Sequence, residues 1–344
     1  MTEAMRALVD LLSDVRSKLQ GSGVSQRSEA HQILEAALNR LEQTLARRPT
    51  ILVAGESNSG KTSVANLLAG LDALPSAVVA NTSVPVRLRH GKEPAVMART
   101  ADGAVSLSLA SNDDALPRFL HSGMQSIEIE WPTMLGNNFE LLDTPPWPIS
   151  PQLIRDADIL LWCSVAPRPW TESERQAIAG LPLRLRERSI LVVTHKDALP
   201  MSDQAKVMDR YREHAQELVS AIVMIDSTEH KSKATFDDLE PFVEELSKSL
   251  SAELGESPLV GDPAEAPDTS SLQSLRDALE PLLEAYWDHR ALTGRRLCRH
   301  LAQALTPVIS GAKDVGADAS SASEPGYGPD AAILANIASR LSTA

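Results

Sequence analysis

The sequence has 344 residues, of which 43% are hydrophobic and 23% are charged, and these proportions are ordinary for a globular protein. The formal net charge of −13 argues against the basic surface of a nucleic-acid-binding protein and against broad attraction to anionic lipid. Two cysteines, Cys163 and Cys298, are too few for a disulfide framework, and no apolar run approaches the roughly 18 residues of a membrane span. We therefore expect a cytoplasmic protein whose membrane contact, if any, is peripheral.

The first 48 residues predict two helices. Apolar residues recur at helical spacing from Met5 to Leu19, and the pattern stops at Gly21-Ser22-Gly23. A second apolar stripe follows between Ile33 and Leu45. Because each stripe covers one helix face, these N-terminal helices need a partner surface.

From Thr50 onward, short apolar runs alternate with turns and helical stretches. The runs occupy residues 51–54, 127–129, 139–142, 159–162, 190–193 and 222–225. Buried strands of this length with helices between them predict a mostly parallel, doubly wound sheet of the α/β class. We place this domain at residues 49–250.

The C-terminal third contains a linker, a helix and a tail. Residues 251–268 hold five acids, no bases, three prolines and two glycines, which predicts a flexible acidic linker. A helical pattern covers 269–311, with Pro281 and Gly294 as positions where it could kink or divide. We expect 312–344 to be mostly disordered, with a weak helix at 331–341. The terminal helices are expected to form a small bundle beside the sheet; the alternative is that each packs on the sheet separately.

Residues 55–62, GESNSGKT, fit the phosphate-binding pattern GxxxxGK[ST] in full and lie between an apolar strand and a helical run. In such a P-loop, successive backbone N–H groups surround the β-phosphate at a helix N-terminus. Lys61 would bring positive charge to the β- and γ-phosphates, and the Thr62 hydroxyl would ligate Mg²⁺. The predicted nucleotide-binding residues here are Gly55, Asn58, Ser59, Gly60, Lys61, Thr62 and Ser63. The alternative is a glycine-rich turn without a ligand.

The segment Thr194-His195-Lys196-Asp197 follows the apolar run 190–193 and indicates which nucleotide base the protein binds. GTPases carry [NT]KxD at this place, and the aspartate accepts hydrogen bonds from N1–H and the amino group of guanine. Asp197 and Thr194 fit this pattern, while His195 replaces the lysine. Adenine has an acceptor at N1 and no 2-amino group, so Asp197 favours GTP. A polar loop at a strand end is the alternative.

Together these motifs resemble the dynamin-like GTPases, particularly their bacterial members, over roughly residues 50–250. The resemblance rests on the P-loop, on Leu74-Pro75 followed by the TxxP element at residues 82–85, on Asp143-Thr144-Pro145, and on residues 194–197. It implies that Thr82 helps to bind Mg²⁺ and to position the attacking water, that Asp143 holds Mg²⁺ through water, and that a guanine-contacting loop lies near Ser227. It also implies that helices flanking the GTPase domain form a short neck bundle.

Besides His195, further positions depart from the family pattern, among them Asn58, whose place is usually taken by serine in eukaryotic dynamins. Pro146 replaces the glycine of the DxxG element, whose N–H normally donates to the γ-phosphate; proline has no N–H. Ser57 occupies the place of a water-orienting glutamine and is too short to match its reach. Trp147, after the proline pair, is either a mobile anchor of this element or a cover for the core. Lys61, Thr82 and Ser57 remain the predicted catalytic positions, and Thr62, Thr82 and Asp143 the predicted metal-binding ones.

The expected function is Mg²⁺-dependent GTP hydrolysis that drives a conformational switch and is slow without a partner or dimer. The expected ligands are GTP, GDP and Mg²⁺; the expected protein partners are a second copy, paired in the presence of GTP, and an unidentified protein. Three alternatives stay open: a GTP-dependent scaffold that does not hydrolyse, a ribosome- or RNA-associated GTPase, and an ATP-using P-loop enzyme. The charge of −13 disfavours RNA, and Asp197 disfavours ATP.

Overall fold

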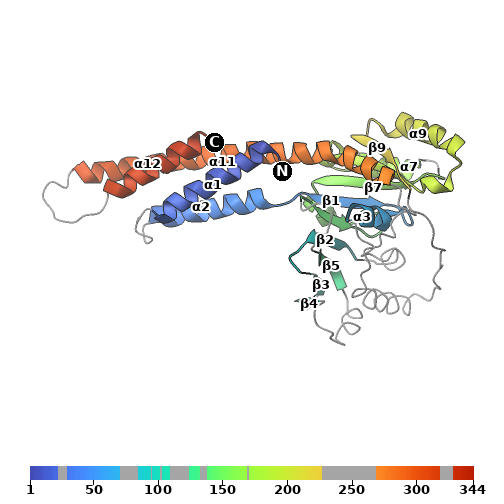
Figure 1. The fold of residues 1–344 in the computed structure, drawn as a ribbon, viewed down its shortest axis with the longest axis horizontal. Helices are drawn as coiled ribbons and strands as arrows, with labels where there is room; N and C mark the ends of the chain where they lie inside the picture. The colour runs from blue at the N-terminus through green and yellow to red at the C-terminus, as the bar shows by residue number, and fades with distance from the viewer. Residues whose placement is uncertain are drawn as a thin grey trace. The chain divides into compact units, whose positions relative to one another are not determined.

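The computed structural model describes residues 1–21, 29–69, 84–93, 95–100, 103–108, 124–131, 138–168, 170–226, 269–317 and 328–344. These form two compact units, one of Met1–Arg47 with Leu283–Ala344 and one of Arg48–Leu282 (Figure 1). The predicted acidic linker, 251–268, lies outside the described residues. None of the described helices combines the length and the apolar character needed to cross a bilayer.

The second unit contains a mixed nine-stranded sheet in the order β4-β3-β5-β2-β6-β1-β7-β8-β9. Its strands are β1 (Thr50–Gly55), β2 (Val86–His90), β3 (Ala95–Thr100), β4 (Gly103–Ser108), β5 (Met124–Trp131), β6 (Glu140–Asp143), β7 (Ile159–Val165), β8 (Ser189–Thr194) and β9 (Ala221–Met224). Strands β6, β1, β7, β8 and β9 pair in parallel, as do β2 and β5. The predicted α/β class with a mostly parallel sheet is therefore confirmed.

Helices cover both faces of the parallel part of the sheet. They are α3 (Lys61–Ala69), α6 (Pro151–Asp156), α7 (Glu172–Ala179), α8 (Leu183–Arg186), the short η1 (Lys196–Ala198) and α9 (Met201–Ala215). Helix α3 lies against β1 and β6 on one face. On the other face α7, α8 and α9 bury a core around Trp162, together with Leu52, Leu142 and Leu191. Two covered faces explain why β1, β7 and β8 are apolar almost throughout.

Strands β2, β3 and β4 were not predicted from the sequence. Strand β2 runs antiparallel to β6, and β3 runs antiparallel to both β4 and β5. In β2 buried Val86 and Leu88 alternate with partly exposed Arg87 and Arg89, so no continuous apolar run marks the strand. Such alternation is typical of a sheet with one polar face.

The first unit is a bundle of α1 (Glu3–Gly21), α2 (Glu29–Ala46), α12 (Gly328–Ser342) and the later part of α11 (Thr269–Ala317) (Figure 1). Their apolar stripes share one core. The predicted bundle of N- and C-terminal helices is confirmed. The prediction of a mostly disordered tail over 312–344 needs correction, because α11 continues to Ala317 and α12 covers 15 residues. Helix α12 is ordered by the burial of Leu334, Ile337 and Leu341.

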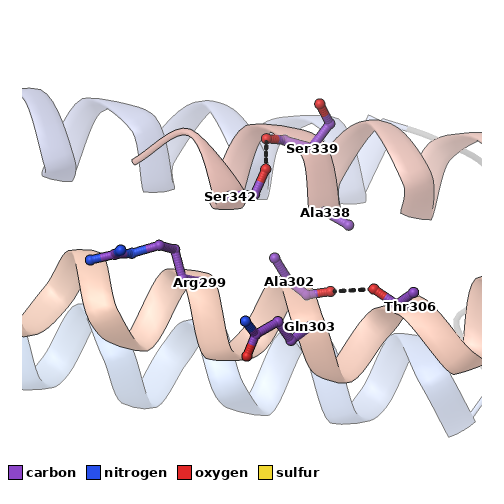
Figure 2. A pocket seen from close by; sticks show the side chains of 7 residues that line it. All are labelled: Arg299, Ala302, Gln303, Thr306, Ala338, Ser339 and Ser342. Carbon is purple, nitrogen blue, oxygen red and sulfur yellow. Dashed lines mark hydrogen bonds between the residues drawn. The ribbon is translucent and has the colours of Figure 1, made fainter.

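A cavity of about 330 Å³ lies between α11 and α12 within this bundle (Figure 2). Its walls are mostly small or polar side chains: Arg299, Ala302, Gln303, Thr306, Ala338, Ser339 and Ser342. The Thr306 and Ser342 hydroxyls donate to the Ala302 and Ser339 carbonyls of their own helices. These two hydroxyl groups therefore already have hydrogen-bond partners within their own helices.

Helix α11 passes through both Pro281 and Gly294 without dividing. Packing against α1 and α2 explains why position 294 is a glycine. A Cβ added there would lie 2.4 Å from Cδ2 of Leu8 and 2.8 Å from Cδ2 of Leu45. The glycine therefore lets α1 and α2 approach α11 closely.

Substitution Gly294→Val should lower the free energy of unfolding by about 1–3 kcal/mol, because the added methyl groups overpack the bundle core. Urea unfolding followed by circular dichroism measures the change. Ala285→Val, at an exposed position of the same helix, is the matched control. An unfolding free energy of Gly294→Val equal to or above that of the wild type would contradict the close packing at this position.

Candidate functional site

The P-loop begins where β1 ends and leads directly into α3. A Cβ added to Gly55, whose φ is +152°, would lie 2.4 Å from the main-chain oxygen of Cys163 on β7. Gly60 has φ +79°, and a Cβ there would lie 3.2 Å from Thr194 on β8. Only glycine combines these backbone angles with so close an approach. The loop is thus pressed against the ends of the two strands that follow it in the sheet.

The middle of the loop faces outward. Ser57 and Asn58 are exposed, and Asn58 adopts the left-handed conformation with φ 56°, which asparagine tolerates better than most residues. Ser59 turns inward and is 1% exposed, and its hydroxyl lacks a hydrogen-bond partner among the described residues. Ser63, in the first turn of α3, is half-buried.

Lys61 is buried and folds back over the loop. Its ammonium donates a hydrogen bond to the Glu56 carbonyl at 2.7 Å. Burial lowers the pKa of Lys61, against the opposing influence of the negative groups nearby, Asp143 among them. A cation held by a neutral carbonyl is available to an incoming phosphate, which offers it a full negative charge.

Below the loop, the Thr62 hydroxyl donates to Oδ2 of Asp143 at 2.8 Å. Burial raises the pKa of the Asp143 carboxyl to about 6, although the Thr62 hydroxyl and the charge of Lys61 act in the opposite direction. The second oxygen, Oδ1, is buried and has no hydrogen-bond partner in the described part of the chain. A hydroxyl and an unsatisfied carboxylate oxygen are hard ligands of the kind that Mg²⁺ prefers, so the predicted metal-binding residues Thr62 and Asp143 fit this ion.

The segment after Asp143 is tied to the P-loop. The Thr144 hydroxyl donates to the Val53 carbonyl at 2.8 Å, and the Trp147 N–H donates to the Gly55 carbonyl at 3.0 Å. The Trp147 ring meets Trp162 edge-on, with centroids 5.3 Å apart. Trp147 therefore covers the core in this structure. Pro146, between these anchors, has no N–H to offer.

Thr194 connects the predicted guanine motif to the P-loop. Its buried hydroxyl lies 2.9 Å from the Ser59 carbonyl, 3.2 Å from the Ser164 carbonyl and 2.9 Å from Nδ1 of His195. This side chain was predicted to contact the nucleotide, yet it is fully enclosed by protein. Its contacts instead make Thr194 a positioning residue for the loop.

His195 and Asp197 lie at the turn that follows β8. His195 is left-handed, with φ 59°, and Asp197 is exposed in η1. The Lys196 N–H donates to the Ile225 carbonyl at 3.2 Å, so the end of β9 lies beside this turn. Thr82 and Ser227, which the sequence also assigned to the site, lie outside the described residues.

The structure brings Arg168 and Ser173, which the sequence did not single out, to the second residue of the P-loop. Glu56 accepts a hydrogen bond from the Ser173 hydroxyl at 3.0 Å and forms an ion pair with Arg168, Nη1 to Oε2, at 3.5 Å. The Tyr211 hydroxyl lies 3.0 Å from the Ser164 hydroxyl. No motif marks Arg168, Ser173 or Tyr211; only the pairing of β7 beside β1 indicates that the segment after β7 lies next to the P-loop.

A second unforeseen contact joins the end of β9 to α11. The Asp226 N–H donates to the Ser271 hydroxyl at 3.1 Å, and Ser271 is 2% exposed. Asp226 directly precedes the predicted guanine-contacting position.

Among the described residues, no group of three or more His, Cys, Asp or Glu side chains is arranged to hold a metal ion.

Comparison with known proteins gives one family profile, one similar sequence and several solved structures. The Dynamin family profile matches residues 51–196. Dynamin-like protein 2 of Campylobacter jejuni subsp. jejuni serotype O:23/36 is 26% identical over 234 residues, which cover 63% of this chain and 38% of that protein. This chain thus spans well under half the length of that relative.

Two solved structures of an oligomerised bacterial dynamin pair, described as a mechanism for long-range sensing and tethering of membranes, are also similar. Their TM-scores are 0.48 and 0.45, with 18% and 15% sequence identity. The matches cover 91% and 92% of this chain and 49% and 60% of the solved chains.

Substitution Asp143→Asn should change how stability depends on pH. Because the folded pKa of about 6 lies above the ordinary 3.8, the metal-free folded protein binds a proton that the unfolded chain has already lost between these values. The wild type should therefore lose up to about 3 kcal/mol relative to the variant as pH rises from 4 to 7. Urea unfolding in a chelator measures this difference, with Asp209→Asn, an exposed acid on α9, as the control. A difference that does not vary with pH would contradict the raised pKa.

Proposed function

Because residues 51–196 match the Dynamin family profile, we propose that this chain is a dynamin-like GTPase that binds GTP with Mg²⁺ and hydrolyses the nucleotide slowly until a partner completes the site. The observation that carries the proposal is the buried Thr62–Asp143 pair beneath the P-loop, with one carboxylate oxygen unsatisfied. The tests are nucleotide titration and single-turnover hydrolysis.

The P-loop residues from Gly55 to Ser63 bind the phosphates in this proposal. The backbone N–H groups and the N-terminus of α3 stabilise negative charge, and Lys61 moves from the Glu56 carbonyl to the β- and γ-phosphates. The support is the tight seating of the loop on β7 and β8, which sets its backbone before a ligand arrives.

Magnesium would be held by the Thr62 hydroxyl, with Asp143 acting through its free oxygen or through water, and Thr82 is proposed as the third metal-binding residue. When bound, the ion neutralises charge on the β- and γ-phosphates. Ionisation of Asp143, whose pKa burial raises, is favoured by a cation at this place.

Asp197 is proposed to accept hydrogen bonds from N1–H and the amino group of guanine, with His195 beside the base and Ser227 nearby. Asp197 is exposed at the end of β8, at the carboxyl edge of the sheet where the P-loop also lies. Ligands of open α/β sheets bind at this edge.

Hydrolysis would be an in-line attack of water on the γ-phosphorus that breaks its bond to the β-phosphate oxygen. Two donors expected in such a site are missing, because Pro146 has no N–H and Ser57 is short. Each lost charge-stabilising donor costs roughly 10²–10³ in rate. A second copy, paired across the nucleotide face, or another protein is proposed to supply what is missing.

The switch would reach the helical bundle through α11. Ser271 binds the main chain of Asp226, beside the proposed base site, and the same helix continues to Ala317 in the bundle. Movement at the end of β9 on nucleotide exchange therefore has a direct path to that helix. A cytoplasmic location, peripheral membrane contact and the absence of a nucleic-acid partner remain proposals that rest on the sequence alone.

Substitution Asp197→Ala should weaken both GTP and GDP binding by roughly 100-fold, because two charge-assisted hydrogen bonds to guanine are lost. Titration with fluorescent nucleotides measures the affinities, and weak ATP binding should not change. Asp203→Ala removes the same charge six residues away, at the start of α9, and should bind like the wild type. A wild type that prefers ATP would support the ATP-using alternative instead.

Substitution Pro146→Gly or Pro146→Ala restores the missing N–H and should raise the single-turnover hydrolysis rate about tenfold or more. Phosphate release with enzyme in excess measures the rate, and Pro145→Ala is the control for a change of backbone stiffness. Alanine and glycine both restore the N–H but differ in backbone flexibility. An effect of the N–H itself should therefore raise the hydrolysis rate in both variants. If the wild type binds GTP without hydrolysing it, and neither variant gains hydrolysis, the result would favour the non-hydrolysing scaffold.

A further inference from the structure

We propose that Arg168 supplies a second positive charge to the γ-phosphate, and that Glu56 stores this arginine beside the P-loop while no nucleotide is bound. The inference rests on the proposed binding of GTP and names a charge donor within this same chain.

The main chain holds Arg168 next to the loop. Strand β7 pairs in parallel with β1, so the segment that follows β7 emerges at the same sheet edge as the P-loop. The Arg168 N–H donates to the Val165 carbonyl at 3.0 Å, and its own carbonyl lies 3.3 Å from the Tyr211 hydroxyl. The backbone is therefore fixed on both sides, while the side chain is 53% exposed and can reorient.

The contact that stores the arginine is loose. Nη1 of Arg168 lies 3.5 Å from Oε2 of Glu56, and the Glu56 side chain is 29% exposed. Exposed ion pairs of this kind contribute little to stability. Ser57, the next residue of the loop, is exposed. A triphosphate bound beside it would carry more negative charge than the Glu56 carboxylate and would attract the Arg168 guanidinium away from Glu56.

Glu56 can release the arginine without losing all its partners. Its Oε1 accepts a hydrogen bond from the Ser173 hydroxyl at 3.0 Å, in the first turn of α7, where the helix dipole favours a negative group. Its carbonyl accepts the hydrogen bond from Lys61. Both cations beside the loop are thus held by one residue, Glu56.

The chemistry of the site gives the second cation a purpose. Charge builds up on the γ-phosphate oxygens during hydrolysis, and an arginine placed there accelerates related enzymes strongly. Position 146 offers no N–H to the γ-phosphate, because proline has none. Among the described residues, Lys61 is the cation that belongs to the P-loop itself. Arg168 is the neighbouring cation within reach of that loop's second residue.

A simpler role for Arg168 is to neutralise Glu56, and the two roles make different predictions. If the arginine only neutralises, its removal has no effect once Glu56→Gln has removed the negative charge. If it serves the third phosphate, its removal weakens GTP binding relative to GDP in the Glu56→Gln background as well.

The test compares Glu56→Gln with the double variant Glu56→Gln/Arg168→Ala in the full chain. Fluorescent GTP and GDP titrations give the ratio of the two affinities, which requires no turnover, and single-turnover phosphate release gives the rate. Glu56→Gln/Arg168→Lys keeps the charge and should recover part of the loss. Arg175→Ala, on the exposed face of α7, controls for the loss of an arginine nearby.

We expect the double variant to lose about tenfold in GTP affinity and in hydrolysis rate relative to Glu56→Gln, with GDP affinity unchanged. If the ratio of GTP affinity to GDP affinity is equal in these two variants while the wild type binds GTP, the proposed role of Arg168 is overturned but the proposed function is not. A wild type that binds no guanine nucleotide would overturn the proposed function itself. Circular dichroism and thermal unfolding verify that each variant is folded.

Discussion

The close approach of the P-loop to β7 and β8 is the constraint on which the rest of the site depends. Gly55 lies so near the Cys163 carbonyl that a single added carbon would overlap it, and a carbon added to Gly60 would make a tight contact of 3.2 Å with Thr194. The Thr194 hydroxyl then completes the arrangement by binding the Ser59 carbonyl. Three strands thus determine the backbone of one loop, and that backbone is what a phosphate would meet.

A buried cluster of opposite charges lies directly under this loop. Lys61 and Asp143 are both removed from water, which lowers the pKa of the lysine and raises that of the acid. Burial therefore opposes the charged form of both side chains, and their mutual attraction does not offset it. In the proposed complex with GTP and Mg²⁺, a phosphate beside Lys61 and a cation beside Asp143 would together stabilise the charged forms of both side chains.

Much of this could be predicted from local pattern. The P-loop, the strand before it and the helix after it are contiguous in sequence, and glycine spacing records the backbone geometry that the loop needs. The parallel core strands were recognisable because burial on both faces makes them continuously apolar. The single-faced stripes of α1 and α2 likewise required a partner, which the bundle provides.

What only the tertiary structure decided concerns residues that share no segment. Glu56, Arg168 and Ser173 meet because β7 was placed beside β1, and Ser271 meets Asp226 because α11 begins near the end of β9. Thr194 matched a nucleotide-binding motif, yet its neighbours turned its hydroxyl to the loop. Strands β2 to β4 and the ordering of α12 depended on pairing and burial against distant elements. The sequence by itself determined where a phosphate loop forms, because local backbone geometry is written in consecutive residues; strand order, set by long-range packing, determined which side chains surround it.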